Sequence, residues 1–527
     1  MVVLGIVAQA IRWLGGAQLW LDEQMIARNI RDRDFGGLAA ALDYNQSAPI
    51  GWLWAQRLVV VLFGTDERTL RLLPFLFAAG SLVLAWLICR RYLGVAGTCG
   101  VVALFAVNPA VLRYSTEVKQ YSADVFFVLL LIGVALWAVR TPLIARRFLI
   151  WWATAALACL FSMGAILATP GLAILLVGAA WWRGRWWSAV RAGLPAVIWL
   201  LTFVVHYWLS LRHVLANDYM TQFWAGRGFP PEDAGGRGTV AWVVRRLEVL
   251  GVDPLGLDAA GLGRDWLIFA CVVFWTMTAL GVAVAMSRRP PMGLLLAVPT
   301  ASAFVLAILW ISPLYMRLAM WMMPALFLSV GFAVDAAARA AIRPLRRGAS
   351  TEPTSRGRPG WLRWTAAGAG ALAVLIVMVP YGPVVATRFR PAAPIPFDYR
   401  ASTAWLQAQH RSGDLTIGIH GSHDAIGWYD PDNLLNPAQW VVVPGPDEGC
   451  DQDNLRQRLA GFDRVLVYGE LRGKEAMLTG EALSTILADH AESVQEGEFG
   501  PRGMVQIVVL RPDPAPATDG GPCLVFR

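Results

Sequence analysis

Several residues in the sequence have the side chains that acid–base chemistry and phosphate binding require. The adjacent acids Asp22 and Glu23 directly follow an apolar segment. Charged side chains at a membrane edge are energetically costly, and a carboxylate is also a common base for removing the proton of an attacking hydroxyl. The pair is therefore the first candidate for catalysis. A structural role fits it too, because Asp22 precedes the apolar pattern Met25, Ile26 and could cap a helix.

A second polar stretch, Arg113 to Asp124, lies between two apolar segments. If a helix opens within it, Glu117, Tyr121 and Asp124 share one face, because their spacing is i, i+4 and i+7. This face would look into the same outer cavity as Asp22. We expect Glu117 to bind hydroxyl groups or help hold a metal.

Lys119 is one of only two lysines in a chain that contains 43 arginines. A lysine ammonium is a compact point charge, suited to a phosphate whose negative charge grows as a bond breaks. Arg317, after Pro313, is a second candidate phosphate ligand. The alternatives are a lysine kept by chance at a solvated turn and an arginine snorkelling at the interface.

The composition predicts membrane-spanning helices as the elements that must position these residues. The 527 residues are 56% hydrophobic and 16% charged, which is typical of a multi-pass membrane protein. A spanning helix needs about 20 apolar residues, and about 11 such segments can be placed. Their approximate positions are 2–20, 71–89, 97–114, 122–139, 148–167, 168–182, 192–211, 266–286, 293–312, 315–338 and 363–381.

Arginine positions predict the orientation, because Lys and Arg collect in short cytoplasmic loops. Arginines cluster in alternate loops, near residues 90, 140, 185 and 288 and again from 339 to 363. We therefore expect a cytoplasmic N-terminus, and an outer location for residues 21–70, 113–121 and 212–265 and for the part of the chain after about residue 382.

Charge is divided unevenly along the chain. Residues 398–527 contain 10 Lys and Arg against 19 Asp and Glu, and the rest contains 35 against 18. The positive balance is thus explained by topology, and no nucleic-acid partner is expected.

Four regions are predicted. Residues 1–340 form a transmembrane catalytic core, 341–362 a basic cytoplasmic linker and 363–381 the last transmembrane helix. Residues 382–527 alternate β-prone runs (415–419, 440–443, 464–468, 505–510) with helical patterns (401–411, 453–460, 481–490), which predicts a soluble extracytoplasmic α/β domain. Cys450 and Cys523 both lie there, and either a disulfide or free thiols fit the sequence.

The motifs together resemble the integral-membrane glycosyltransferases of the C-type fold, specifically bacterial glycosyltransferase family 39, related to protein O-mannosyltransferases and lipid A aminoarabinose transferase. The resemblance covers roughly residues 15–340. It is carried by Leu19–Glu23, Asn45–Pro49 before Trp52, Arg71–Pro74, Asn108–Pro109, Tyr114–Tyr121, and Arg317 ahead of Pro324. Many members have a His-Pro-Pro-like motif where this chain has Gln46 to Pro49, so no histidine role is expected there.

The resemblance implies transfer of a sugar from a polyprenyl-phosphate carrier to an acceptor hydroxyl on the outer face of a bacterial plasma membrane, with inversion. Asp22 would then be the base and Glu23 would orient it or bind a cation. Glu117 belongs to the catalytic group. Lys119 and Arg317 would bind the donor phosphate, and Gln46, Tyr121 and Asp124 would bind substrate. The sugar, and whether the acceptor is glycan, lipid or protein, stay open.

Other functions and a metal ion also remain open from the sequence. A transporter or flippase of lipid-linked sugars is the main alternative, and it predicts acids buried at mid-membrane. A membrane-anchored binding module would make the membrane acids dispensable. A divalent metal ion is possible, with Glu23, His206 and His213 as candidate ligands, although a histidine near a helix end is more often structural.

Overall fold

The structure is a computed structural model of the 527-residue chain. It describes residues 1–140, 143–216, 218–233, 235–347, 374–387, 396–419, 426–435, 440–444, 455–512 and 522–526, together with 372, 389 and 422. The chain forms two compact units, each described by itself below. We call Met1–Gly15, Asp34–Ala41 and Ser47–Pro391 the membrane unit, and Gly16–Arg33, Leu42–Gln46 and Ala392–Arg527 the α/β unit.

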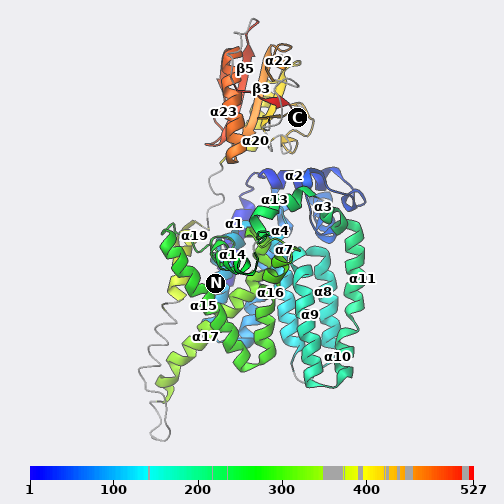
Figure 1. Ribbon diagram of the computed structural model, residues 1–527, viewed down its shortest axis with the longest axis vertical. Coiled ribbons are helices and arrows are strands. Elements are labelled where there is room, and N and C mark those ends of the chain that lie inside the picture. Colours follow the sequence, from blue (N-terminus) through cyan, green and yellow to red (C-terminus); the bar gives the residue numbers. More distant parts are fainter. Residues whose placement is uncertain are drawn as a thin grey trace. The chain divides into compact units, whose positions relative to one another are not determined.

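Helices make up the membrane unit (Figure 1). In the described part of the chain, seven helices are long and apolar enough to cross a membrane. They are α4 (Glu67–Tyr92), α7 (Tyr121–Ala138), α9 (Met163–Arg183), the continuous run Trp186–Leu215, α15 (Arg264–Arg288), α16 (Pro290–Ile308) and the run Met316–Ala340. Shorter apolar helices are α1 (Val2–Leu14), α3 (Ile50–Phe63), α5 (Val95–Val107) and the run Val374–Thr387.

The two longer runs contain several elements. Trp186–Leu215 comprises α10 (Trp186–Gly193), α11 (Ala196–His206), the π-helical turn η3 (Tyr207–Leu211) and α12 (Arg212–Leu215); Met316–Ala340 comprises the 3-10 helix η4 (Met316–Met322) and most of α17 (Met323–Arg347). The other helices are η1 (Gly37–Ala39), α6 (Pro109–Tyr114), α8 (Ala145–Phe161), α13 (Asp218–Gly228), α14 (Gly235–Val252), η5 (Val379–Tyr381) and α19 (Gly382–Thr387).

The expected multi-pass helical architecture is confirmed, since each of the eleven predicted segments overlaps one of the apolar helices above or α8. Polar caps set several helix starts. Asp66 at α4, Asn108 at α6 and Ser162 at α9 each accept hydrogen bonds from the first-turn backbone N–H groups. Of the predicted linker 341–362, residues 348–362 lie outside the described part of the chain, as do residues 363–371 and 373.

Glycines allow α17 to pack closely against its neighbours α5 and α15. A methyl group added at Gly281 of α15 would overlap the backbone carbonyl of Ser329 on α17. A Cβ added at Gly97 of α5 would lie 2.6 Å from the carbonyl oxygen of Gly331. Backbone-to-backbone contact through small residues is a common way for helices to associate in a membrane.

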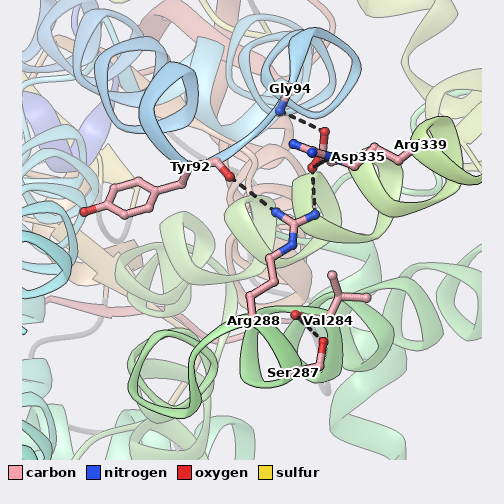
Figure 2. A network of polar contacts seen from close by, with 7 residues as sticks. All are labelled: Tyr92, Gly94, Val284, Ser287, Arg288, Asp335 and Arg339. Carbon is pink, nitrogen blue, oxygen red and sulfur yellow. Dashed lines mark hydrogen bonds and ion pairs between the residues drawn. The ribbon is translucent and has the colours of Figure 1, made fainter. Parts of the chain in front are cut away.

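A buried carboxylate joins three helices of this unit (Figure 2). Asp335 on α17 is 2% exposed and binds Arg288 of α15 at 2.8 Å and Arg339 at 2.9 Å. Its other oxygen accepts a hydrogen bond from the Gly94 N–H at 2.8 Å, just before α5. Arg288 also donates to the carbonyl of Tyr92, at 3.3 Å. The two arginines and the amide supply the charge and donors that a buried carboxylate needs.

The α/β unit contains a six-stranded mixed sheet in the order β4-β5-β3-β1-β2-β6 (Figure 1). Strand β1 is parallel to β2 and β3, and the remaining pairs are antiparallel. The strands are β1 (Leu415–Ile419), β2 (Trp440–Val442), β3 (Arg464–Glu470), β4 (Ala491–Glu496), β5 (Gly503–Leu510) and β6 (Val525–Phe526). The helices are α2 (Leu21–Asp32), η2 (Asp43–Asn45), α20 (Tyr399–Gln409), α22 (Leu455–Leu459) and α23 (Gly473–His490).

Helices cover both faces of this sheet. On β3, Val465 and Val467 point into a core shared with α22 and α23, while Leu466 and Tyr468 point into a core shared with α20. The alternation follows from the two-residue period of a strand. The predicted α/β domain is therefore confirmed. Cys523 is disulfide-bonded and the other described cysteines are free thiols; Cys450 lies outside the described residues.

Candidate active site

The acid pair occupies the first turn of α2. The helix starts at Leu21 with Trp20 as its cap residue, so the prediction that Asp22 caps the helix is wrong by two residues. The Glu23 carboxylate accepts a hydrogen bond from the Trp20 N–H at 3.2 Å, and its side chain is 1% exposed. Asp22 is partly exposed. The positive end of the helix dipole favours both negative charges.

Gln46 lies in the same unit, after the turn η2. Tyr44 and Asn45 have positive φ angles of 63° and 52°, which bend the chain sharply. The Gln46 amide donates to the carbonyl of Tyr44 at 3.1 Å and contacts the sulfur of Met25 on α2 at 3.6 Å. Gln46 thus packs directly against α2, the helix that carries the acid pair.

In the membrane unit, the turn between α6 and α7 carries the second predicted group. Arg113 donates to the Glu117 carboxylate at 2.7 Å. Glu117 is 6% exposed and Lys119 7% exposed, and the Lys119 N–H donates to the Glu117 carbonyl at 2.7 Å. Because α7 begins only at Tyr121, Glu117 is not on its face, so the predicted three-residue face is wrong for Glu117.

Aromatic rings connect this turn to the predicted Arg317 of η4. The rings of Tyr114 and Tyr121 pack edge to face, with centroids 5.1 Å apart. The Arg317 guanidinium lies over the Tyr121 ring, 5.9 Å from its centroid. An arginine can lie on an aromatic face and bind an anion through its N–H groups at the same time. The structure therefore brings Glu117, Tyr121 and Arg317 into one neighbourhood.

Asp253 is a member of this neighbourhood that the sequence did not indicate. Burial raises the pKa of its carboxyl group, and the positive charges of Arg113 and Arg317 act in the opposite direction. Its position is set by the neighbouring backbone, because the Asn108 amide donates to the carbonyls of Pro254 at 3.1 Å and Leu255 at 2.9 Å. Asn108 also caps α6, so one side chain fixes both Asp253 and the helix of Arg113.

Two further arginines extend the positive charge. Arg12 of α1 interacts electrostatically with Arg71, Arg113 and Glu117. Arg71 on α4 is only 5% exposed. Several arginines, of which Arg71 is buried, gather around the carboxylates of Glu117 and Asp253. Packing alone explains this concentration of charge poorly, whereas an anionic ligand would be strongly stabilised there.

Asp124 has a structural role in the membrane unit. Its carboxylate accepts hydrogen bonds from the Ser162 hydroxyl at 2.7 Å and the Gly164 N–H at 3.0 Å. This ties α7 to the junction between α8 and α9. Gly164 in turn packs directly on Trp321 of η4, the helix that carries Arg317. Asp124 thus supports the element that holds a candidate phosphate ligand.

The histidines offer little support for a metal site. His206 of α11 is fully buried, and His213 lies on α12. Among the residues that the structure describes, no three His, Cys, Asp or Glu side chains are grouped so that they could hold a metal ion. Neither histidine is therefore assigned to a metal by this geometry.

Comparison with known proteins identifies the architecture. The model of the family described as dolichyl-phosphate-mannose-protein mannosyltransferase matches residues 47–208. ArnT from Cupriavidus metallidurans matches in its apo state (TM-score 0.53) and bound to undecaprenyl phosphate (TM-score 0.54); in both cases identity is 15%, over 96% of this chain and 97% of that one.

The chain has the C-type glycosyltransferase fold. The archaeal oligosaccharyltransferase AglB from Archaeoglobus fulgidus, in complex with an inhibitory peptide and a dolichol-phosphate, also matches, with TM-score 0.51 and 13% identity over 93% of this chain and 72% of that one. No curated protein matches the sequence. The predicted resemblance to C-type integral-membrane glycosyltransferases is confirmed. Within this fold, Asp22, Glu23 and Gln46 belong to the α/β unit, and the other predicted site residues belong to the membrane unit.

Proposed function

We propose that this protein is an inverting glycosyltransferase that moves a hexose or pentose from a polyprenyl-phosphate carrier to an acceptor hydroxyl. The acceptor would be a glycan, a lipid or a protein on the outer face of a bacterial plasma membrane. The observation that carries the proposal is the group of Glu117, Asp253 and several arginines around the α6–α7 turn, in which Glu117 and Arg71 are buried. The complexes of ArnT with undecaprenyl phosphate and of AglB with a dolichol-phosphate support a lipid-linked donor.

The proposed chemistry uses each group for one task. Asp22 accepts the proton of the acceptor hydroxyl as its oxygen forms the new bond to the anomeric carbon. The bond between that carbon and the phosphate oxygen breaks, and the phosphate leaves with the electron pair. Lys119 and Arg317 stabilise the growing negative charge. Glu23 orients Asp22, and Glu117, Gln46 and Tyr121 hold sugar or acceptor hydroxyls.

The proposed topology follows from the arginine distribution. The N-terminus and the basic linker 341–362 are cytoplasmic, and residues 21–70, 113–121, 212–265 and 382–527 are extracytoplasmic. The transmembrane core is residues 1–340, completed by the last helix at 363–381. This arrangement places Asp22 and Glu117 on the same side of the membrane as the acceptor.

Purified protein, a polyprenyl-phosphate sugar and a membrane extract as the acceptor source test the proposal. Asp22→Asn should lower turnover by at least about 100-fold, since general-base catalysis contributes that much or more. The control is Asp265→Asn, an exposed acid in the first turn of α15. Near-normal turnover by Asp22→Asn would remove the base assignment.

A second pair of variants tests phosphate binding. Lys119→Ala should raise the KM for the donor at least about tenfold, because a charge-assisted hydrogen bond contributes roughly 1.5–3 kcal/mol. The matched control is Lys474→Ala, because Lys474 is the only other lysine in the chain. An unchanged donor KM in Lys119→Ala would show that this ammonium does not contact the phosphate.

A further inference from the structure

Helix α2, which carries the acid pair, is attached to the C-terminal part of the chain by contacts near its start and its end, all within the α/β unit. Leu21, the residue before Asp22, packs against a hydrophobic core contributed by α20, β3, β5 and the segment 426–435. The first turn of the helix is thereby joined to the interior of a folded domain that lies almost 400 residues away in the sequence.

Polar contacts hold the start of α2. The Leu19 N–H donates to the hydroxyl of Tyr429 at 2.9 Å. The Arg472 guanidinium lies over the Trp20 ring, 5.0 Å from its centroid. The Trp20 N–H donates to the Glu23 carboxylate. The contacts that hold Leu19 and Trp20 therefore also restrain the position of the acid pair.

Arg31 holds the other end of α2. Its guanidinium donates to the carbonyls of Gly427 and Trp428, each at 3.2 Å, and lies 5.0 Å from the centre of the Trp428 ring. The turn fits tightly here, since a Cβ added at Gly427 would lie 2.6 Å from the Arg28 guanidinium carbon. Trp428 is buried, and its ring is one of the groups against which Arg31 packs.

A helix of 12 residues fixed near both ends has little freedom to rotate or shift. Catalytic groups gain most of their effect when a rigid support holds them in reacting geometry, and a displacement of about 1 Å can lower a rate about 100-fold. We propose that the C-terminal part of the α/β unit is a positioning element for Asp22 and Glu23. The positioning residues are Tyr429, which contacts the start of α2, and Arg31, which joins the end of α2 to residues 427 and 428. This inference rests on the proposed role of Asp22 as the base.

The test compares Tyr429→Phe with Tyr399→Phe in the full chain. Tyr429→Phe removes the acceptor of the Leu19 N–H. Tyr399→Phe removes a hydroxyl of the same unit that is bonded to Glu470, on β3. Hydrogen exchange of residues 19–26 measures the attachment of α2, and kcat and donor KM measure its catalytic effect.

In Tyr429→Phe we expect exchange over residues 19–26 to accelerate and kcat to fall, each about tenfold, the scale expected for one lost hydrogen bond. The donor KM should stay within about twofold, since donor binding is assigned to the membrane unit. Tyr399→Phe should match the wild type in both. Arg31→Gln should reproduce the Tyr429→Phe pattern, with the fastest exchange at residues 28–32. It replaces Tyr429→Phe as the test variant if Tyr429→Phe does not fold.

Two results would overturn the inference. If exchange accelerates in Tyr429→Phe while kcat is unchanged and Asp22→Asn is inactive, the attachment exists but does not position the base. If exchange is also unchanged, Tyr429 does not hold α2. Normal turnover by Asp22→Asn would instead remove the proposed base and this inference together, so failure of the proposed function is recognisable.

Discussion

Replacement of Asp335 by Asn should destabilise the membrane unit, by an amount that follows from its three partners in Figure 2. The asparagine keeps an oxygen that can accept from the Gly94 N–H, so that hydrogen bond survives. The negative charge between Arg288 and Arg339 is lost. Because the Asp335 side chain is 2% exposed, water cannot replace it fully at this position.

The two arginines contribute unequally. Arg288 is 30% exposed, so its charge-assisted bond should contribute about 2 kcal/mol. Arg339 is 54% exposed, and solvent screening reduces its pair to about 0.5 kcal/mol. We therefore expect Asp335→Asn to lower the free energy of unfolding by about 2–3 kcal/mol and Arg339→Gln by about 0.5 kcal/mol.

Reversible unfolding in mixed detergent micelles, followed by the fluorescence of the 25 tryptophans, measures these differences. Arg288→Gln should fall between the other two variants, because it loses the stronger ion pair of Asp335 and keeps the weaker pair with Arg339. The reasoning is refuted if Asp335→Asn and Arg339→Gln have the same stability as the wild type.

Two further substitutions test local features. Desolvation raises the pKa of Asp66, but hydrogen bonds from Thr69 and from the Arg68 N–H outweigh this and leave the pKa below its usual range. Its stabilising effect is therefore present at neutral pH and lost as the pH falls through the lowered pKa; Asp66→Ala should cost about 1 kcal/mol at pH 7 and flatten the acid limb of a stability–pH curve. Gly281→Val should sharply reduce the yield of folded protein in size-exclusion chromatography, because its side chain would overlap the backbone of α17. The matched control is Gly178→Val, which should leave the yield unchanged because an added Cβ there meets open space.

The sequence was sufficient for elements with a strong local pattern. The apolar segments fold as expected because they are long and apolar enough to cross a membrane, and the β-prone runs of β1, β3 and β5 do so because their side chains are buried in hydrophobic cores. Strand β4 (Ala491–Glu496) was not predicted, since all its residues after Ala491 are exposed and no apolar alternation marks it. It exists because it pairs with β5 at the edge of the sheet.

Members of the candidate site could be proposed from the sequence only where the residue type was itself unusual. Lys119 was indicated by its rarity, and Glu117 by its place among polar residues between two apolar segments. Asp253 was not, because its loop has no periodicity and its neighbourhood depends on Asn108, which is 145 residues earlier in the sequence. The attachment of α2 to Tyr429 could not be predicted for the same reason, since contacts between residues so far apart in the sequence leave no local pattern.

The glycine contacts of α17 have a consequence for how a prenyl chain could travel. At Gly281 and Gly97 the backbones of α15 and α5 meet that of α17 without intervening side chains. Hydrocarbon cannot pass through such seams without separating the helices, which would sacrifice their dispersion contacts. If the prenyl chain of the proposed donor reaches the α6–α7 turn from the bilayer, it must therefore pass between other helices. Cross-linking those helices should block its entry.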